Sequence, residues 1–411
     1  MKKTLPYLGL AFLTGLNLFN YMDRYVLASV VPPLKGELGF TDAEIGWLTS
    51  AFMIGYFATA PIFGYLGDRW PRKGLIAAGI AFWSLGTVLS GLSNGFWSLL
   101  ACRVLVGLGE ASYAVLAPAW IADSFPAERR NNAMTIFYVA MPVGAALGFM
   151  IGGVALAHGG WRTGFWWAGA PGLVLALAML ALKEPKRGEF NGGPTGEKAD
   201  LAGMASLLGI SDYVLVVAGY TAYTFAIGAF GVWAPTFLNR VHAMNLSDAD
   251  QFFGQMLVVG GLLGTLIGGF AATWWEKKTP AGYALTITLS AFLTTIAATA
   301  AFLASSVTMA MAFLGAAAFL SFLPTGPQTT IQMECVPVHL RASAMALSIF
   351  AIHLFGDFWS PVLVGRLADA GGQPGSPAGL QHAMLILPVA MAVAVFFWGW
   401  LALKQTAVKR P

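Results

Sequence analysis

Long apolar stretches separated by short polar ones dominate the sequence. A hydrocarbon core about 30 Å thick takes roughly 20 helical residues to cross, and twelve stretches come close to that length. They cover approximately residues 5–34, 45–66, 74–92, 97–122, 133–157, 163–182, 213–238, 252–275, 283–303, 307–333, 342–364 and 383–403. A transmembrane β-barrel would instead show segments of about ten residues with alternating polarity. The pattern therefore predicts an all-α membrane protein with twelve transmembrane helices.

The polar segment 183–204 divides the chain into two halves. It is rich in charged residues, glycine and proline, and six apolar stretches lie on each side of it. The halves also resemble each other, because PAERRNNAM (126–134) and PVHLRASAM (337–345) share Pro, Arg, Ala and Met in register. We expect two pseudo-symmetric six-helix bundles, residues 1–182 and 205–411, joined by a cytoplasmic linker over residues 183–204. Parallel repeats of this kind place a substrate site between them near the membrane midplane.

Composition supports the membrane assignment and adds an orientation. The chain is 57% hydrophobic and only 10% charged, with a mean hydropathy of +0.69. Most of its 23 Lys and Arg residues fall on alternate loops, and the opposite loops hold only Lys35, Arg162, Arg240 and Arg366. Because cytoplasmic loops carry an excess of Lys and Arg, we expect a multi-pass protein of the cell inner membrane with both termini cytoplasmic. This distribution explains the net charge of +4 without a nucleic-acid partner.

Several ionisable residues lie inside the predicted membrane helices. Asp23 and Arg24 fall on the first helix, Arg103 and Glu110 on the fourth, and Asp357 on the eleventh. A charge at the bilayer centre costs about 2.5–3.5 kcal/mol on insertion scales, so such residues usually face a cavity and pair with one another. We therefore take them as candidates for substrate binding and proton coupling.

Helical spacing brings some of these residues onto one face. Arg103 and Glu110 are seven residues apart, and His353 precedes Asp357 by one turn. The four charges of the N-terminal half sum to zero, which leaves two interpretations open. Either they form a permanent bridge that orients the first and fourth helices, or one carboxylate takes up a proton and frees an arginine to hold an anionic substrate. The second interpretation predicts pH-dependent activity.

Other polar residues are candidates for lining the same cavity. They lie within two turns of Asp23 or one turn of Glu110, and they are Asn17, Asn20, Tyr21, Tyr25 and Tyr113. In the tenth helix, FLPTGPQ (322–328) contains Pro324, Gly326 and Pro327 and predicts a kink. The carbonyls freed there could line a cavity together with Gln328.

A charged motif, GYLGDRWPRK (64–73), ends the second helix at the expected cytoplasmic face. Its aspartate could form charge-assisted hydrogen bonds to neighbouring helix ends and hold an inner gate shut. The alternative is that the motif carries ordinary positive-inside charge. The loop after the fourth helix offers a similar acidic and basic pair. The candidate gate residues are Asp68, Arg69, Arg72, Asp123 and Arg130.

Patterns typical of other functional classes are missing from the sequence. We find no Walker loop, no catalytic Ser or Cys elbow and no HExxH motif, and the lone Gly-x-Gly of VGLGEAS (106–112) follows no strand. Cys102 and Cys335 lie far apart and the five histidines are scattered, so neither a disulfide nor a metal site is indicated. We expect no enzyme activity and no cofactor. The rival from another class is an intramembrane enzyme or a non-transporting sensor.

At these motifs the chain resembles a known family. GYLGDRWPRK resembles the loop signature of the major facilitator superfamily, with Pro71 where that pattern usually has Gly, and RVLVGLGE (103–110) resembles its helix-four motif. Within the superfamily, NYMDRYVLA (20–28) and GEASYAVLAPAWIADSFPAERR (109–130) resemble the Spinster family. The resemblance implies export of amphipathic lipids such as sphingosine phosphate or lysophospholipids, with proton coupling. It also implies that Asp23, Arg24 and Glu110 are the central polar residues, with Arg103 supporting them.

The sequence as a whole predicts a monomeric secondary transporter that works by alternating access. In this hypothesis Arg24 binds the anionic headgroup of a lipid or amphipathic substrate, and Asp23 and Glu110 exchange protons. Symporters of sugar acids also carry an Asn-Tyr-x-Asp-Arg segment on their first helix. A proton-coupled symporter of small organic anions is therefore the alternative.

Overall fold

The computed structural model describes residues 5–40, 42–188, 190, 200–371 and 376–407. Throughout these residues the regular structure is helical, with no strand, which confirms the predicted all-α fold. The two ends of the chain, on which the predicted cytoplasmic termini depend, and residues 189 and 191–199 of the predicted linker lie outside the described residues.

Up to residue 206, the described part of the chain forms seven helices. They are α1 (Leu5–Leu38), α2 (Asp42–Arg69), α3 (Arg72–Ser90), α4 (Phe96–Ser124), α5 (Ala127–His158), α6 (Trp161–Ala181) and the short α7 (Leu201–Ser206).

After residue 206, the described residues form more helical elements, several of them short. They are η1 (Leu207–Gly209), α8 (Ser211–His242), α9 (Leu246–Glu276), α10 (Gly282–Phe302), α11 (Val307–Phe322), α12 (Thr325–Glu334), η2 (Val338–Leu340), α13 (Arg341–Ile352), η3 (His353–Asp357), α14 (Ser360–Ala370), α15 (Pro377–Met384) and α16 (Ile386–Ala407). The break between α11 and α12 falls at Leu323 and Pro324, within the motif FLPTGPQ (322–328) for which the sequence predicts a kink. A second break is the π-helical turn η3 between α13 and α14.

Ten helical segments in the described residues are long and apolar enough to cross a membrane. The first two helices, α1 and α2, have 34 and 28 residues but are not among these ten. The number twelve therefore stays a prediction, although the helices agree in position with the predicted spans.

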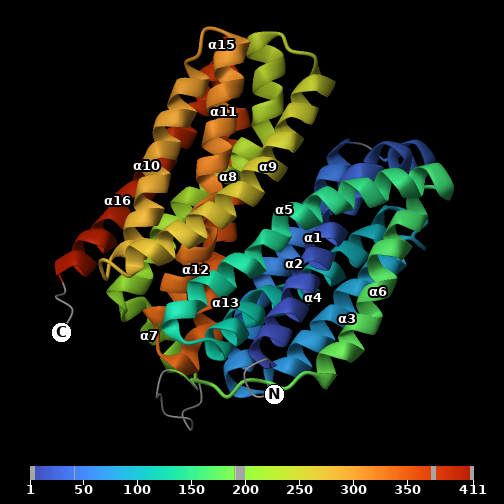
Figure 1. Ribbon diagram of the computed structural model, residues 1–411. Coiled ribbons are helices and arrows are strands. Elements are labelled where there is room, and N and C mark those ends of the chain that lie inside the picture. The colour runs from blue at the N-terminus through green and yellow to red at the C-terminus, as the bar shows by residue number, and fades with distance from the viewer. Residues whose placement is uncertain (1–4, 41, 189, 191–199, 372–375, 408–411) are drawn as a thin grey trace. The chain divides into compact units, whose positions relative to one another are not determined.

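The chain divides into two compact units (Figure 1). Unit 1 comprises residues 1–207 and 336–350, and unit 2 comprises residues 208–335 and 351–411. Residues 336–350, which contain η2 and most of α13, therefore pack with unit 1 although they belong to the second half of the sequence. The predicted pseudo-symmetry of two six-helix bundles stays a prediction.

Close packing of α1 against α5 positions the charged residues of α1. Gly144 and Gly148 of α5 lie against the backbone of Leu18 and Met22, and a Cβ added at Gly148 would lie 2.9 Å from the Cβ of Tyr25. Glycine permits this approach because it has no side chain. With one face of α1 covered by α5, Asp23 contacts α3 and Arg24 contacts α2 and α4.

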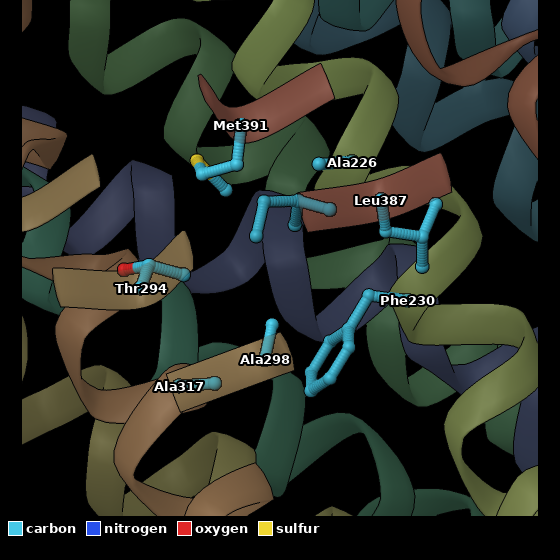
Figure 2. A pocket seen from close by; sticks show the side chains of 8 residues that line it. Ala226, Phe230, Thr294, Ala298, Ala317, Leu387 and Met391 are labelled. Carbon is cyan, nitrogen blue, oxygen red and sulfur yellow. The ribbon is translucent and has the colours of Figure 1, made fainter. Parts of the chain in front are cut away.

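Unit 2 is held together by apolar contacts among α8, α10, α11 and α16. A small apolar cavity lies among these four helices (Figure 2). It is lined by Ala226, Ile227, Phe230, Thr294, Ala298, Ala317, Leu387 and Met391. The hydroxyl of Thr294 donates to the Ser290 carbonyl at 2.8 Å, so the lining presents no free polar group to a ligand.

Candidate functional site

Asp23 is a buried carboxylate in the middle of α1, with 1% of its surface exposed. The Thr87 hydroxyl of α3 lies 2.5 Å from its Oδ2 and donates to it. The other oxygen, Oδ1, is buried without a hydrogen-bond partner. Within the described residues no Lys or Arg forms an ion pair with Asp23. A buried ionised carboxylate usually has several donors, so this one is poorly stabilised in its charged form.

Arg24, the next residue, forms the ion pair of the site. Its Nη2 lies 2.5 Å from Oε2 of Glu110 on α4, and the carboxylate of Glu110 is fully buried whereas the Arg24 side chain is 23% exposed. Charge-assisted hydrogen bonds of this kind are roughly twice as strong as neutral ones. The pair therefore fixes α1 against α4.

Aromatic rings surround the guanidinium of Arg24. Its Cζ lies 5.0, 4.8 and 5.3 Å from the ring centroids of Tyr21, Phe52 and Tyr56. Cation–π contacts contribute about 0.5–2 kcal/mol each, depending on desolvation. Phe52 and Tyr56 come from α2, so Arg24 is held by three helices.

Arg103 lies in the same region without a hydrogen-bonded anion. It is 3% exposed, its Nε is buried without a hydrogen-bond partner, and its guanidinium lies 5.0 Å from the centroid of Phe52. Asp23 and Glu110 interact with it electrostatically. The structure therefore brings together the four charges singled out in the sequence, but it pairs only Arg24 with Glu110.

Two of the predicted lining residues hydrogen-bond backbone carbonyls with their side chains. The Asn17 amide donates to the Phe137 carbonyl at 3.0 Å, and the Tyr113 hydroxyl donates to the Leu13 carbonyl. These bonds join α1 to α5 and α4. Both side chains are buried, so their visible role is to fix the helices around the charges.

The remaining predicted lining residues of α1 lie nearer the charges. Tyr21 forms one side of the aromatic surround of Arg24, and the buried Asn20 has an Nδ2 without a hydrogen-bond partner. Tyr25 is partly buried and its Cβ lies beside Gly148 of α5. Asn20 and Tyr21 therefore lie beside Asp23 and Arg24, whereas Tyr25 packs on α5.

Three residues of this site were not singled out in the sequence. They are Thr87, which donates to Asp23, and Phe52 and Tyr56, which flank Arg24. Each is an ordinary residue of an apolar helix, so no local pattern distinguishes it. Only the packing of α2 and α3 against α1 reveals its role.

The candidates of unit 2 form a smaller polar cluster. Nδ1 of His353 lies 2.9 and 3.0 Å from the two carboxylate oxygens of Asp357, within the π-helical turn η3. The predicted one-turn pair is therefore formed. Gln328, on α12 just after the break at Pro324, is buried and hydrogen-bonds Tyr220 of α8.

The predicted gate aspartate Asp68 is fully buried at the end of α2. Its two oxygens accept the backbone N–H groups of Ala342 and Ser343 at 3.0 and 2.7 Å, and Arg72 lies 3.8 Å away. A helix N-terminus presents unpaired N–H groups and a partial positive charge, so it binds a carboxylate well. Asp68 therefore holds the start of α13 against α2.

Asp123 binds two arginines at the end of α4. Its Oδ2 lies 2.6 Å from Nη1 of Arg72, and its Oδ1 lies 2.5 Å from Nη1 of Arg341. All three side chains are nearly completely buried. Arg341 was not singled out in the sequence, because its partner lies in the other half of the chain.

The other two predicted gate residues have different contacts. Arg130 is buried and donates to the carbonyls of Ala122 and Phe125 at 3.1 and 3.4 Å, at the end of α4. The Arg69 guanidinium lies 4.4 Å from the centroid of the Tyr65 ring.

Residues 184–188 of the predicted linker bind the same network. Glu184 accepts the backbone N–H groups of Arg72 and Lys73 at 2.8 and 3.2 Å, so it caps α3, whose own N-cap residue provides no side-chain bond. Arg187 donates to two carbonyls at the end of α2, of which that of Trp70 is 2.6 Å away. Burial lowers the pKa of Arg187, and the nearby Arg72 guanidinium lowers it further.

Comparisons with known proteins place this arrangement in a family. The model of the Major Facilitator Superfamily matches residues 13–361. Protein spinster homolog 1 of Xenopus laevis is 33% identical over 405 residues, which cover 93% of this chain and 76% of the relative. The sphingosine-1-phosphate transporter SPNS2 of Danio rerio is 31% identical over 424 residues, covering 96% of this chain and 83% of the relative.

Solved structures agree on the fold. A bacterial homolog of the human lysosomal transporter Spinster, in an inward-facing unoccupied conformation, aligns with a TM-score of 0.68 at 24% identity, covering 100% of this chain and 99% of that one. The fucose:proton symporter FucP of E. coli aligns with a TM-score of 0.77 at 16% identity, covering 97% and 99%. These relatives and this fold are those of transporters rather than of enzymes. The chain belongs to the Spinster family of the Major Facilitator Superfamily.

Proposed function

We propose that the protein is a proton-coupled transporter of an amphipathic anionic lipid, such as a lysolipid or a sphingosine-phosphate-like molecule. It works by alternating access, with the site around Asp23, Arg24, Arg103 and Glu110 exposed to each side of the membrane in turn. The observation that carries this proposal is a buried carboxylate with a single hydrogen bond, Asp23, next to a tightly formed ion pair.

Asp23 is the first proton carrier in this proposal. Charging a buried group is costly unless it is paired and hydrogen-bonded, and Asp23 has one donor where Glu110 has the guanidinium of Arg24. Neutral Asp23 therefore disturbs the site less than neutral Glu110 would. Glu110 exchanges its own proton only when Arg24 leaves it.

Proton uptake at Asp23 would prepare the site for an anion. The four charges sum to zero when both carboxylates are ionised, and protonation of Asp23 leaves one positive charge in excess. Arg103, which has no hydrogen-bonded anion, and Arg24, which is 23% exposed, would then bind an anionic headgroup. This coupling of charges is the physical basis of a pH-dependent cycle.

The lipid nature of the substrate is supported by relatives and by the walls of the site. One relative is named as a sphingosine-1-phosphate transporter, and another, from Arabidopsis thaliana, as a probable sphingolipid transporter at 33% identity. The aromatic residues Tyr21, Phe52 and Tyr56 around Arg24 would favour an apolar chain beside the headgroup. The same arginines would accept a small organic anion, which is the alternative substrate class.

The network at the ends of α2 and α4 acts as the inner gate in this proposal. Asp68 and Asp123 hold residues 336–350 by backbone N–H groups and by Arg341, and these contacts would break in one state of the cycle. We place the gate on the cytoplasmic side of the inner membrane, with both termini on that side. The unit of function is a monomer.

Transport by the protein in proteoliposomes tests the proposal. Flux of radiolabelled sphingosine phosphate and of glucuronate is measured with and without an imposed pH gradient, for the native protein, Asp23→Asn and Glu110→Gln. We expect gradient-stimulated flux of the lipid alone, and loss of the stimulation in Asp23→Asn. Equal, gradient-insensitive rates in all three proteins would refute proton coupling, and flux of glucuronate alone would favour the alternative substrate.

A further inference from the structure

The hydroxyl of Thr87 has one hydrogen and two acceptors within reach. Oγ1 lies 2.5 Å from Oδ2 of Asp23 and 3.0 Å from the carbonyl oxygen of Trp83, one turn earlier on α3. A threonine hydroxyl donates a single hydrogen but can accept two. The Thr87 hydroxyl therefore donates its hydrogen to the ionised carboxylate, and the Trp83 carbonyl is a second acceptor within hydrogen-bond distance.

Protonation of Asp23 would reverse this hydrogen bond without breaking the network. The new carboxylic O–H would donate to Thr87 Oγ1, and the hydroxyl of Thr87 would rotate to donate to the Trp83 carbonyl. One proton arrives from water and every hydrogen still has an acceptor. A buried polar group is costly only when it lacks a partner, so both protonation states would be satisfied in the same geometry.

Neighbouring helices hold Thr87 in place for this exchange. The residue is 1% exposed, and α6 packs so closely on it that a Cβ added at Gly169 would lie 3.0 Å from the Thr87 Cβ. Its backbone and side chain therefore have little freedom to move, and rotation of the hydroxyl hydrogen is the simplest available change.

Other charged groups around Asp23 come from few helices. The α4 helix contributes Glu110 and Arg103, and α1 itself contributes Arg24, and all three interact with Asp23 electrostatically. Arg162, at the start of α6, is bound beyond the end of α3, where its Nη2 donates to the carbonyl of Ser93, six residues after Thr87, at 3.4 Å. Among the described residues of α3, α5 and α6, charged and histidine side chains occur only near the helix ends. They are Arg72, Lys73, Glu128, Arg129, Arg130, His158 and Arg162.

We propose that Thr87 is a positioning residue for proton uptake, a hydroxyl switch that supports both the ionised and the neutral form of Asp23. This inference rests on the proposed role of Asp23 as the proton carrier. Thr87 favours the ionised form, since a hydrogen bond to a charged acceptor is roughly twice as strong as a neutral one. Without the hydroxyl, Asp23 would hold its proton to a higher pH.

The test is an infrared titration of the purified full-length protein in detergent. The carboxylic acid band that Asp23→Asn removes is followed against pH in the native protein, in Thr87→Val, which keeps the shape but lacks the hydroxyl, and in Thr87→Ser, which keeps the hydroxyl. The loss of one charge-assisted hydrogen bond shifts a titration by about one pH unit. We expect that upward shift in Thr87→Val, with Thr87→Ser close to the native midpoint.

Other outcomes distinguish a wrong role for Thr87 from a wrong proton carrier. A midpoint in Thr87→Val equal to the native one, or an equal shift in Thr87→Ser, would overturn the role of the hydroxyl while leaving Asp23 as the carrier. If no titrating band disappears in Asp23→Asn, the proposed carrier itself is wrong. Should Thr87→Val fail to fold, Thr87→Ala serves as the second variant without a hydroxyl, judged by the same midpoint.

Discussion

Asp68→Asn is expected to loosen the start of α13. Asp68 accepts the N–H groups of Ala342 and Ser343 at 3.0 and 2.7 Å, and it is fully buried. N–H groups in the first turn of a helix lack intrahelical acceptors, so their protection from solvent depends on this carboxylate. Asparagine keeps one acceptor oxygen but presents an NH₂ group to the second donor.

The size of the effect follows from these contacts. A hydrogen bond to a charged group contributes about 1.5–3 kcal/mol, and the substitution removes at least one and weakens the other. Local opening would therefore become easier by about 2 kcal/mol, which increases the equilibrium population of the open form roughly 10- to 100-fold because 1.4 kcal/mol is a factor of ten. The increase applies to residues 336–350 and not to the protein as a whole.

Hydrogen–deuterium exchange followed by mass spectrometry measures this local opening directly. The amide hydrogens of peptides that cover residues 338–346 should exchange roughly 10- to 100-fold faster in Asp68→Asn than in the native protein. Asp212→Asn is the control, because Asp212 pairs with Lys404 at a partly exposed site of unit 2. Unchanged exchange of these peptides in folded Asp68→Asn would refute the assigned role of the carboxylate.

Three further predictions concern packing and pairing. Glu110→Gln and Arg24→Gln should each lower the thermal unfolding temperature. In the double variant the decrease should be smaller than the sum of the two single decreases, because the two groups are partners at 2.5 Å. Additive decreases would contradict the ion pair. Gly148→Ala should destabilise the protein by about 1–3 kcal/mol, since the added Cβ would collide with the Met22 carbonyl. Gly15→Ala on α1 is the control, because a Cβ there meets nothing within 4 Å. Equal unfolding temperatures for the two variants would count against the packing of α1 on α5. Ala298→Val should stabilise unit 2 by about 0.5–1 kcal/mol by filling the apolar cavity, compared with Ala300→Val outside it; a lower unfolding temperature would show that the cavity has no room for two methyl groups.

The helices could be predicted from the sequence because the bilayer fixes their length and excludes polar runs. The motif FLPTGPQ (322–328) also predicted an interruption of the tenth helix, which is the break between α11 and α12. The π-helical turn at His353–Asp357 could not be foreseen. A spacing of four residues places two side chains together in an α-helix and in this wider turn alike, so the sequence pattern does not separate them.

The charged residues of the site were predictable because charge is costly in an apolar helix, but their partners were not. Asp23 depends on Thr87 and Arg24 on Phe52, and neither partner differs from its apolar surroundings in the sequence. Arg103, expected to support the central polar residues, lies over the ring of Phe52, which the sequence does not mark as a partner. Pairing is decided by how helices pack, which local patterns do not encode.

The candidate gate residues show that contacts between distant segments are equally hard to predict. Asp68 and Asp123 stand in recognisable motifs, but they bind residues of the segment 336–350, and Glu184 and Arg187 bind the ends of α2 and α3. These contacts join segments far apart in the chain. A polar stretch such as residues 183–188 looks like an ordinary linker until its side chains are seen capping two helices.

The central claim is that Asp23 takes up a proton when the substrate is moved. The most direct measurement is proton movement driven by substrate alone, recorded with a pH-sensitive dye inside proteoliposomes after a gradient of lysophosphatidic acid or sphingosine phosphate is imposed. We expect a pH change with the native protein and none with Asp23→Asn, although Asp23→Asn still binds the lipid. A pH change of equal size with Asp23→Asn would contradict it.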